Sequence, residues 1–139
     1  MNDRAIIDTS AWIMFFRKGK NNKQVADEVE RLIIEELAYY TEPVYIELVV
    51  GAGARSRIRE LEKNFGALPI FKAGEKEWLQ AWKIAFSLRT KGLRVDIVDL
   101  IVAAAAINKD VAVFHHDKHF RMISGIAPLK EYSFLPNKK

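Results

Sequence analysis

The sequence contains no cysteine, and its only histidines are His115, His116 and His119. The absence of cysteine excludes disulfide bonds and thiolate-bound zinc. The three histidines follow one another so closely on a turn that they cannot easily converge on one zinc ion. A metal site elsewhere in the chain must therefore use oxygen ligands, which favours a hard cation such as Mg²⁺ or Mn²⁺.

Long apolar runs are also missing. The longest run, Leu100 to Ile107, is far too short to span a bilayer. The first residues lead into a short strand that ends in an acid, and not into the apolar stretch of an export signal. We therefore expect a cytoplasmic protein that does not associate with membranes.

The length and charge of the chain set further limits. At 139 residues the chain is expected to form a single domain, residues 1–139, with a substantial core. Its net charge is +4, which is compatible with a polyanionic partner but does not establish one.

Short apolar segments alternate with helical patterns along the chain. Strands or extended segments are expected at 5–7, 38–41, 67–71, 111–114 and 126–129, and helices at 11–16, 24–37, 43–50, 75–91 and 93–107. This alternation predicts an α/β fold of three layers, in which helices flank a central, mostly parallel sheet.

The helix expected at 75–91 carries several aromatic residues at helical spacing. Such residues more often pack in a core than stack on bases, so we expect them to be buried. The candidate packing residues are Trp78, Leu79, Trp82, Phe86 and Leu88.

Three aspartates occupy comparable places in this pattern. Asp8 and Asp117 each follow an apolar strand, and Asp99 lies in the first turn of the Ala-rich helix at 93–107. The carboxyl ends of parallel strands and the adjoining helix starts meet at one rim of the sheet, so these acids are expected to lie together. Asp8 has a plainer interpretation as the cap of the next helix.

Glu47 is expected to approach the same rim from the helix at 43–50. Its neighbours on a helix are Val44 and Val50, so full solvation is not expected, although a position at the helix edge stays open. Several carboxylates at close quarters must take up protons or bind a divalent cation. A cation at such a site polarises a phosphoryl oxygen and lowers the pKa of a bound water, which is the chemistry of phosphodiester hydrolysis.

Four motifs follow one another in the chain with these acids inside them. They are Ile7-Asp8-Thr9-Ser10-Ala11-Trp12, Tyr45-Ile46-Glu47-Leu48-Val49-Val50-Gly51-Ala52, Val98-Asp99-Leu100-Ile101-Val102-Ala103-Ala104-Ala105-Ala106 and Phe114-His115-His116-Asp117-Lys118-His119-Phe120. Each motif is weak alone, but their order and spacing resemble those of PIN-domain ribonucleases. The resemblance is closest to VapC-type toxins of toxin–antitoxin pairs, and it covers nearly the whole chain.

The resemblance implies a metal-dependent endoribonuclease that acts as the toxin of a type II pair. It implies that Asp8, Glu47, Asp99 and Asp117 hold Mg²⁺ or Mn²⁺, and that a metal-activated water hydrolyses RNA. It further implies a homodimer and a VapB-like antitoxin that silences the enzyme. Ser10 is expected to support the metal site by a hydrogen bond to a ligand or a bound water.

The chain departs from the family pattern at two positions. His115 stands two residues before Asp117, where the family usually has threonine or serine, so a supporting role for it stays open. Asp96 is an additional acid beside Asp99. It is either a further ligand through water or the cap of the helix, and we favour the cap.

Basic residues supply candidate RNA contacts. These are Arg17, Lys18, Lys20, Arg55, Arg57 and Arg59. Such segments are more often solvated faces, and phosphate contact is the sharper hypothesis.

Other classes of protein remain as alternatives. The main one is a PIN-like module that binds RNA or protein and has lost catalysis, but all four acids are present. A phosphoacceptor domain would need paired acids near the first strand and a further aspartate ending a middle strand, and neither is visible. A flap nuclease would need a helical arch and a longer chain.

Overall fold

The computed structural model describes residues 3–17 and 19–136. Its elements in chain order are β1 (Ala5–Ile7), α1 (Thr9–Phe16), the 3-10 helix η1 (Lys20–Asn22), α2 (Lys23–Ile34), β2 (Ala38–Tyr39), α3 (Glu42–Val50), α4 (Arg55–Phe65), α5 (Glu75–Thr90), α6 (Ile97–Lys109), β3 (Ala112–Phe114), α7 (His119–Ser124) and β4 (Glu131–Tyr132). Among these residues, no helix is both long and apolar enough to cross a bilayer.

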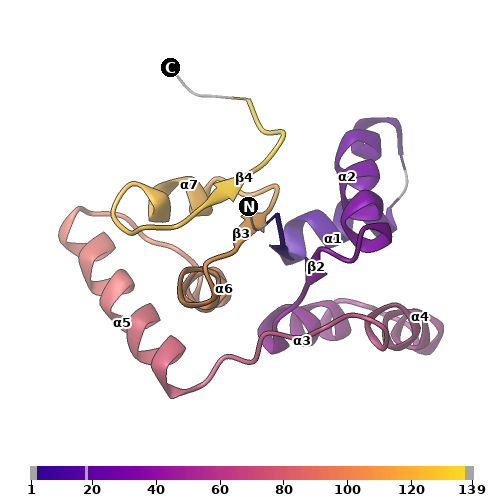
Figure 1. Ribbon diagram of the computed structural model, residues 1–139, viewed down its shortest axis with the longest axis horizontal. Coiled ribbons are helices and arrows are strands. Elements are labelled where there is room, and N and C mark those ends of the chain that lie inside the picture. The colour runs from indigo at the N-terminus through magenta and orange to yellow at the C-terminus, as the bar shows by residue number, and fades with distance from the viewer. Residues whose placement is uncertain (1–2, 18, 137–139) are drawn as a thin grey trace.

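The four strands form one sheet in the order β2-β1-β3-β4, and every neighbouring pair is parallel. The chain moves from β1 to β2 in one direction across the sheet and then returns past β1 to β3 and β4. Since parallel crossovers are right-handed, the two directions of travel place their helices on opposite faces. Accordingly, α1 and α2 cover one face, whereas α3, α6 and α7 lie on the other (Figure 1). The predicted three-layer α/β fold is confirmed.

Helix α6 is the centre of the second layer. All its residues from Asp99 to Ala106 are buried, because it packs against β1 and β3 on one side and against α3, α5 and α7 on the others. Its small alanines allow these neighbours to approach closely. Figure 1 shows α6 end-on in the middle of the molecule, with α5 as an outer helix beyond it. The helix expected at 93–107 therefore exists, but it begins at Ile97.

Two expected extended segments differ from the structure. Residues 67–71 contribute only an isolated bridge between Ile70 and Tyr40. The strand expected at 126–129 is instead β4, at Glu131–Tyr132. Pro128 lacks the N–H that a strand interior needs, and the hydrogen bonds to β3 begin after it, where Val113 N–H donates to the Lys130 carbonyl.

Helix α5 has the expected bounds to within a residue, but the prediction of its core residues was wrong for four of the five. Only Leu88 is buried, whereas Trp78, Leu79, Trp82 and Phe86 are exposed. The helix turns its other face, with Ala81 and Ile84, toward α6. Tertiary packing thus selected the less bulky of the two apolar faces.

Candidate active site at the carboxyl edge of the sheet

Asp8 is held in the interior at the point where β1 ends. It is the N-cap of α1, and its Oδ2 accepts hydrogen bonds from the Ser10 backbone N–H at 3.0 Å and from the Ser10 hydroxyl at 2.7 Å. Its Oδ1 is buried and has no hydrogen-bond partner among the described residues. Burial raises the pKa of Asp8 to about 6, although the hydrogen bonds from Ser10 act in the opposite direction.

Asp8 is therefore both a helix cap and a carboxylate with one oxygen left over. Capping alone satisfies a single oxygen of the side chain. A buried acceptor without a donor costs free energy unless something else meets it, and a cation is one such partner.

Ser10 joins Asp8 to the turn that follows β3. The register of the sheet sets Ile7 beside Phe114, so the two strands end next to each other. The Ser10 hydroxyl donates to Asp8 and accepts a hydrogen bond from the His116 backbone N–H at 2.9 Å. The expected hydrogen bond from Ser10 to a candidate ligand is thus present, and it also fixes the spacing between the two strand ends.

His115 holds the backbone before Asp117. Its ring is fully buried, and burial lowers the pKa of His115 against the effect of the nearby Glu131 carboxylate. Nε2 donates to Glu131 Oε1 at 2.7 Å, and Nδ1 accepts from the Asp117 backbone N–H at 3.1 Å. A neutral ring with its proton on Nε2 satisfies both contacts. The histidine thus orients the turn of Asp117 from inside the protein.

Asp99 lies in the first turn of α6 and is almost completely buried. Burial raises the pKa of Asp99 to about 7, and repulsion from the Asp8 and Asp117 carboxylates adds to the shift. Asp8 and Asp117, the other two aspartates expected at the rim, thus both lie within electrostatic reach of Asp99.

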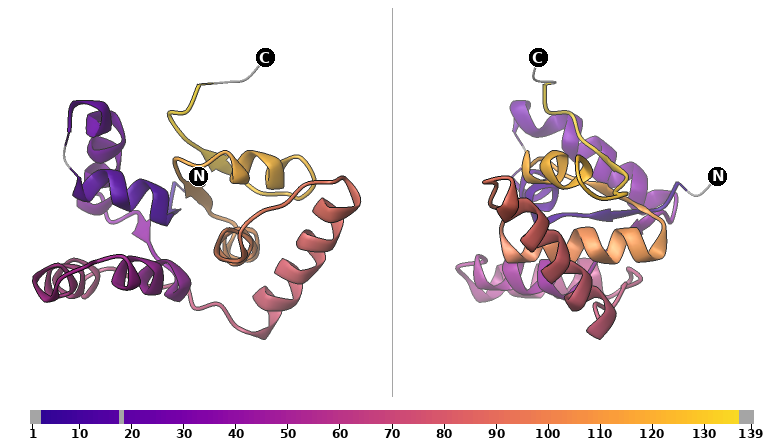
Figure 2. Two further views of the ribbon diagram at one scale, coloured as in Figure 1. Left: turned by 180° about the vertical axis from the view of Figure 1, so that it is seen from behind. Right: turned by 90° about the vertical axis from the view of Figure 1, so that its left-hand side faces the viewer.

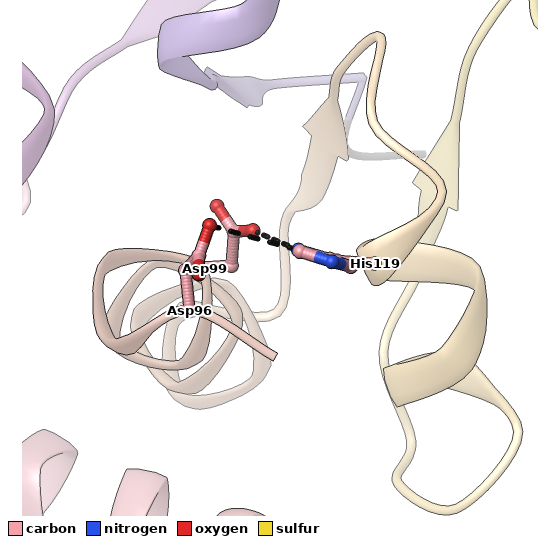
Figure 3. A group of neighbouring side chains, drawn as sticks. All are labelled: Asp96, Asp99 and His119. Carbon is pink, nitrogen blue, oxygen red and sulfur yellow. Dashed lines mark hydrogen bonds and ion pairs between the residues drawn. The ribbon is translucent and has the colours of Figure 1, made fainter. Parts of the chain in front are cut away.

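His119, at the start of α7, points into this group (Figure 3). Its Nδ1–H donates to Asp99 Oδ2 at 2.9 Å, and Nδ1 also lies 3.6 Å from Asp117 Oδ1 and 4.0 Å from Asp96 Oδ2. Burial lowers the pKa of His119, but the hydrogen bond to Asp99 and the surrounding carboxylates raise it by more, so the pKa is raised overall. The imidazole therefore stands where positive charge is favoured.

Asp96 does not act as the side-chain cap that we favoured. It occupies the N-cap position of α6, but its carboxylate makes no capping hydrogen bond and is 80 % exposed. Its oxygen faces the same side of the helix as Asp99, toward His119 (Figure 3). Ligand atoms of Asp96, Asp99 and His119 all lie within 4.8 Å of one another.

Glu47 approaches the site from α3. It is exposed, contrary to the expectation that its apolar neighbours would exclude solvent, because Val50 is exposed as well. The Thr9 hydroxyl donates to Glu47 Oε1 at 2.5 Å, and the charge of Glu47 contributes to the raised pKa of Asp8. Thr9 thus links Glu47 to the helix that Asp8 caps.

The candidate RNA contacts lie outside this cluster. Arg17 and Lys20 are exposed near the end of α1, and Lys18 lies outside the described residues. Arg55 and Arg59 share one face of α4, whereas the helical period turns Arg57 to another face. Figure 1 places α4 at the end of the molecule away from α7.

The donor set suits a divalent metal bound through oxygen. Asp8 brings a buried oxygen without a donor, Asp99 has a raised pKa, and Asp117 and Glu47 bring further carboxylates. Hard cations prefer such ligands, and a positive charge relieves the repulsion among them. The residues present therefore fit Mg²⁺ or Mn²⁺.

Sequence reasoning missed three residues of this site. His119 was treated only as part of a polar turn. Thr9 was considered only as a cap of the next helix or a hydrogen-bond partner of Asp8, and Glu131 was given no role. His119 had a usable signal, since it stands two residues after Asp117 at the start of a helix. Glu131 had none, because its contact to His115 depends on the register of β3 and β4.

Comparison with known proteins agrees with this geometry. The sequence profile of the PIN domain matches residues 5–126. The chain is 33% identical over 133 residues to "VapC ribonuclease Mb1587" of Mycobacterium bovis, covering 93% of this chain and 98% of that protein. "Ribonuclease VapC11" of Mycobacterium tuberculosis matches with the same identity and coverage.

Solved structures share the fold. VapBC-1 from nontypeable Haemophilus influenzae aligns with a TM-score of 0.74 at 23% identity, over 93% of this chain and 96% of that chain. DNA-bound VapBC from Salmonella typhimurium aligns with a TM-score of 0.74 at 16% identity, over 96% and 99% of the two chains. The chain belongs to the PIN-domain family and, within it, to the VapC group.

Proposed function

We propose that this protein is a metal-dependent endoribonuclease and the toxin of a type II toxin–antitoxin pair. The observation that carries the proposal is the buried, unpartnered Oδ1 of Asp8 beside Asp99, at the edge of the sheet where Asp117 also lies. The names of the VapC relatives support ribonuclease activity. Solved VapBC complexes of the same fold support an antitoxin partner.

In this proposal Asp8, Asp99, Asp117 and Glu47 hold Mg²⁺ or Mn²⁺. A cation held there would polarise a phosphoryl oxygen of the RNA and lower the pKa of a bound water. The chain's own groups position the ligands: Ser10 orients Asp8, the His115–Glu131 pair orients Asp117, and Thr9 orients Glu47. His119 holds Asp99 through its Nδ1–H.

The test is cleavage of total cellular RNA by wild type and Asp8→Asn, each with Mg²⁺, Mn²⁺ or EDTA. The matched control is Asp27→Asn, which makes the same chemical change on the exposed side of α2. We expect wild type and Asp27→Asn to cleave only with metal. Asp8→Asn is expected to be slower by roughly 10³-fold, because a lost ligand removes several kcal/mol of transition-state stabilisation.

Two results would count against the proposal. Equal cleavage by wild type and Asp8→Asn would point to another site or a contaminant. No cleavage by folded wild type, freed from any antitoxin, would favour a PIN-like module that binds RNA without cutting it.

A further inference from the structure

His119 brings a nitrogen to a group of side chains that was expected to offer a metal only oxygen. Its Nδ1 lies 2.9 Å from Asp99 Oδ2, 3.6 Å from Asp117 Oδ1 and 4.0 Å from Asp96 Oδ2. Among the described residues, none of these three carboxylates forms an ion pair with a lysine or an arginine. The negative charge around the ring is thus left without a basic side chain of that kind to balance it.

Two of these aspartates and the histidine are arranged as ligands of one ion. Asp96 and Asp99 are three residues apart at the start of α6, so they project from the same face of the helix. Helix α7 lies beside α6 in both views of Figure 2 and brings His119 to this face. Figure 3 shows both carboxylates turned toward the ring, and the three ligand atoms all lie within 4.8 Å of one another.

This spacing suits a tetrahedral ion. An ion with bonds of about 2.1 Å separates its ligand atoms by roughly 3.4 Å. The contact from His119 to Asp99 is shorter than that value, and the contact to Asp96 is longer. Because the Asp96 side chain is 80 % exposed, it can rotate toward the ion at little cost.

One nitrogen and two carboxylates favour a different cation from a set of oxygen ligands alone. Mg²⁺ is bound through oxygen, whereas imidazole suits metals such as Zn²⁺ and Fe²⁺. Zinc sites with three protein ligands keep a fourth position for a water or another small ligand, and the exposed Asp96 leaves this side of the group open to solvent. Only one histidine takes part, so the close spacing of the three histidines in the sequence is no obstacle.

We propose that Asp96, Asp99 and His119 form a site for a divalent cation that accepts nitrogen, such as Zn²⁺, separate from the all-oxygen magnesium site. We call these three residues the mixed site. The cation binds His119 at Nδ1, in place of the proton that this atom now donates to Asp99. That proton passes to solvent, as in other metal sites that contain histidine.

Asp99 is shared between the two sites. In the proposed function it holds Mg²⁺ together with Asp8, whose charge reaches it and whose buried Oδ1 has no hydrogen-bond partner in the part of the chain that the structure describes. A carboxylate that already binds Zn²⁺ attracts a second cation less strongly, and two divalent cations at close range repel each other. Zn²⁺ at the mixed site is therefore expected to weaken Mg²⁺ binding. This consequence rests on the proposed function, whereas zinc binding itself does not.

The first test is calorimetric titration of the full chain with Zn²⁺, in the absence of RNA. Wild type is expected to bind one Zn²⁺ at the mixed site. His119→Gln can still donate to Asp99 but lacks the ring nitrogen, and Asp96→Asn lacks the charge. Each should lower the affinity by at least roughly 10- to 100-fold, which is the cost of losing a mere supporting contact.

Two control variants make the same chemical changes elsewhere. His116→Gln removes a neighbouring imidazole that does not belong to the mixed site, and Asp27→Asn removes an exposed carboxylate of α2. Both should bind Zn²⁺ like wild type. A wild type without Zn²⁺ binding, or binding that survives both His119→Gln and Asp96→Asn, would overturn the proposal.

The second test identifies the nitrogen ligand by NMR of the histidine rings. One equivalent of Zn²⁺ is expected to shift the ¹⁵N signal of His119 Nδ1 and to leave the buried ring of His115 in place. This readout needs only folded protein and no activity. A shift at His116 instead of His119, or no ring shift while Zn²⁺ binds, would contradict the mixed site.

The third test is titration with Mg²⁺, with and without one equivalent of Zn²⁺. Wild type should bind Mg²⁺ about tenfold more weakly when Zn²⁺ is present, a typical coupling between two ligands. Asp96→Asn should bind Mg²⁺ alike in both conditions. Equal Mg²⁺ binding by wild type would refute the competition for Asp99. A wild type that binds Zn²⁺ but no Mg²⁺ would refute the magnesium site of the proposed function and leave the mixed site in place.

Discussion

Asp8 and Asp117 each follow an apolar strand that ends at the same edge of the sheet, yet the protein holds them differently. Asp8 is almost completely buried and depends on Ser10, two residues away. Asp117 keeps a partly exposed side chain. Its backbone N–H donates to His115, and the His115 ring in turn donates to Glu131 of β4. One acid is fixed locally at the cost of desolvation, and the other is fixed through a contact between strands.

One sequence pattern, an apolar strand followed by an acid, thus produces two kinds of site residue in this protein. The buried acid stores unfavourable free energy that a cation can release. The partly exposed Asp117 stores little unfavourable free energy, and its position depends on residues far along the chain.

The largest expected effect concerns stability without metal. Asp8→Asn keeps the helix cap, because asparagine also accepts from the Ser10 N–H, but it removes the buried charge. The folded pKa of Asp8, about 6, lies above the ordinary value of 3.8, so between these pH values the native state binds more protons and stability falls as pH rises. In EDTA, the free energy of unfolding of Asp8→Asn should exceed that of wild type by ~3 kcal/mol above pH 6 and by almost nothing at pH 4.

Denaturant unfolding in EDTA at several pH values measures this difference. Asp117→Asn is the matched comparison, and it should stay within about 0.5 kcal/mol of wild type because its carboxylate is partly exposed. A constant gap between Asp8→Asn and wild type across this pH range would contradict a buried, charged Asp8.

The next effect is stabilisation by metal. Ligand at a hundredfold excess over its dissociation constant stabilises a folded protein by about 2.7 kcal/mol. Mg²⁺ or Mn²⁺ should raise the stability of wild type by that amount and raise that of Asp8→Asn far less. Thermal unfolding with and without metal tests this. Equal stabilisation of both proteins would mean that the cation binds elsewhere.

A smaller effect is expected from the contact that orients Asp117. Glu131→Leu removes the acceptor of the His115 Nε2–H, whereas Glu131→Gln keeps an oxygen there. Such supporting contacts are worth roughly 10- to 100-fold in metal affinity, so calorimetric titration with Mn²⁺ should show that loss for leucine and a much smaller one for glutamine. If both variants bound Mn²⁺ like wild type, His115 would only fill space.

The smallest effect is expected at Thr9. Its hydroxyl donates to Glu47, but the contact is exposed, so Thr9→Val should cost no more than about 1 kcal/mol of stability. If Glu47 is a metal ligand, the loss of RNA cleavage, expressed as an activation free energy, should exceed the loss of folding stability. Unchanged cleavage would mean that Glu47 is not a ligand.

Much of the site could be predicted, because the local sequence determines where its acids lie relative to strands and helices. Asp8, Asp99 and Asp117 stand next to strands and helix starts whose apolar patterns are plain, and parallel strands must end together. The contacts of His119 and Glu131 could not be predicted in this way. They depend on the angle of α7 and on the register of β4, and β4 itself was expected several residues too early.

Helix α5 separates the two kinds of information most clearly. The sequence alone predicts a helix at 75–91 that carries large apolar side chains, since the helical period and Gly92 at its end are local features, and the structure has this helix at Glu75–Thr90. Tertiary packing sets which face is buried. Ala81, Ile84 and Leu88 are buried beside α6, whereas Trp78, Trp82 and Phe86 face solvent. The physical reason is that periodicity identifies an apolar face but not its partner, and packing beside the Ala-rich α6 favours the face with smaller side chains.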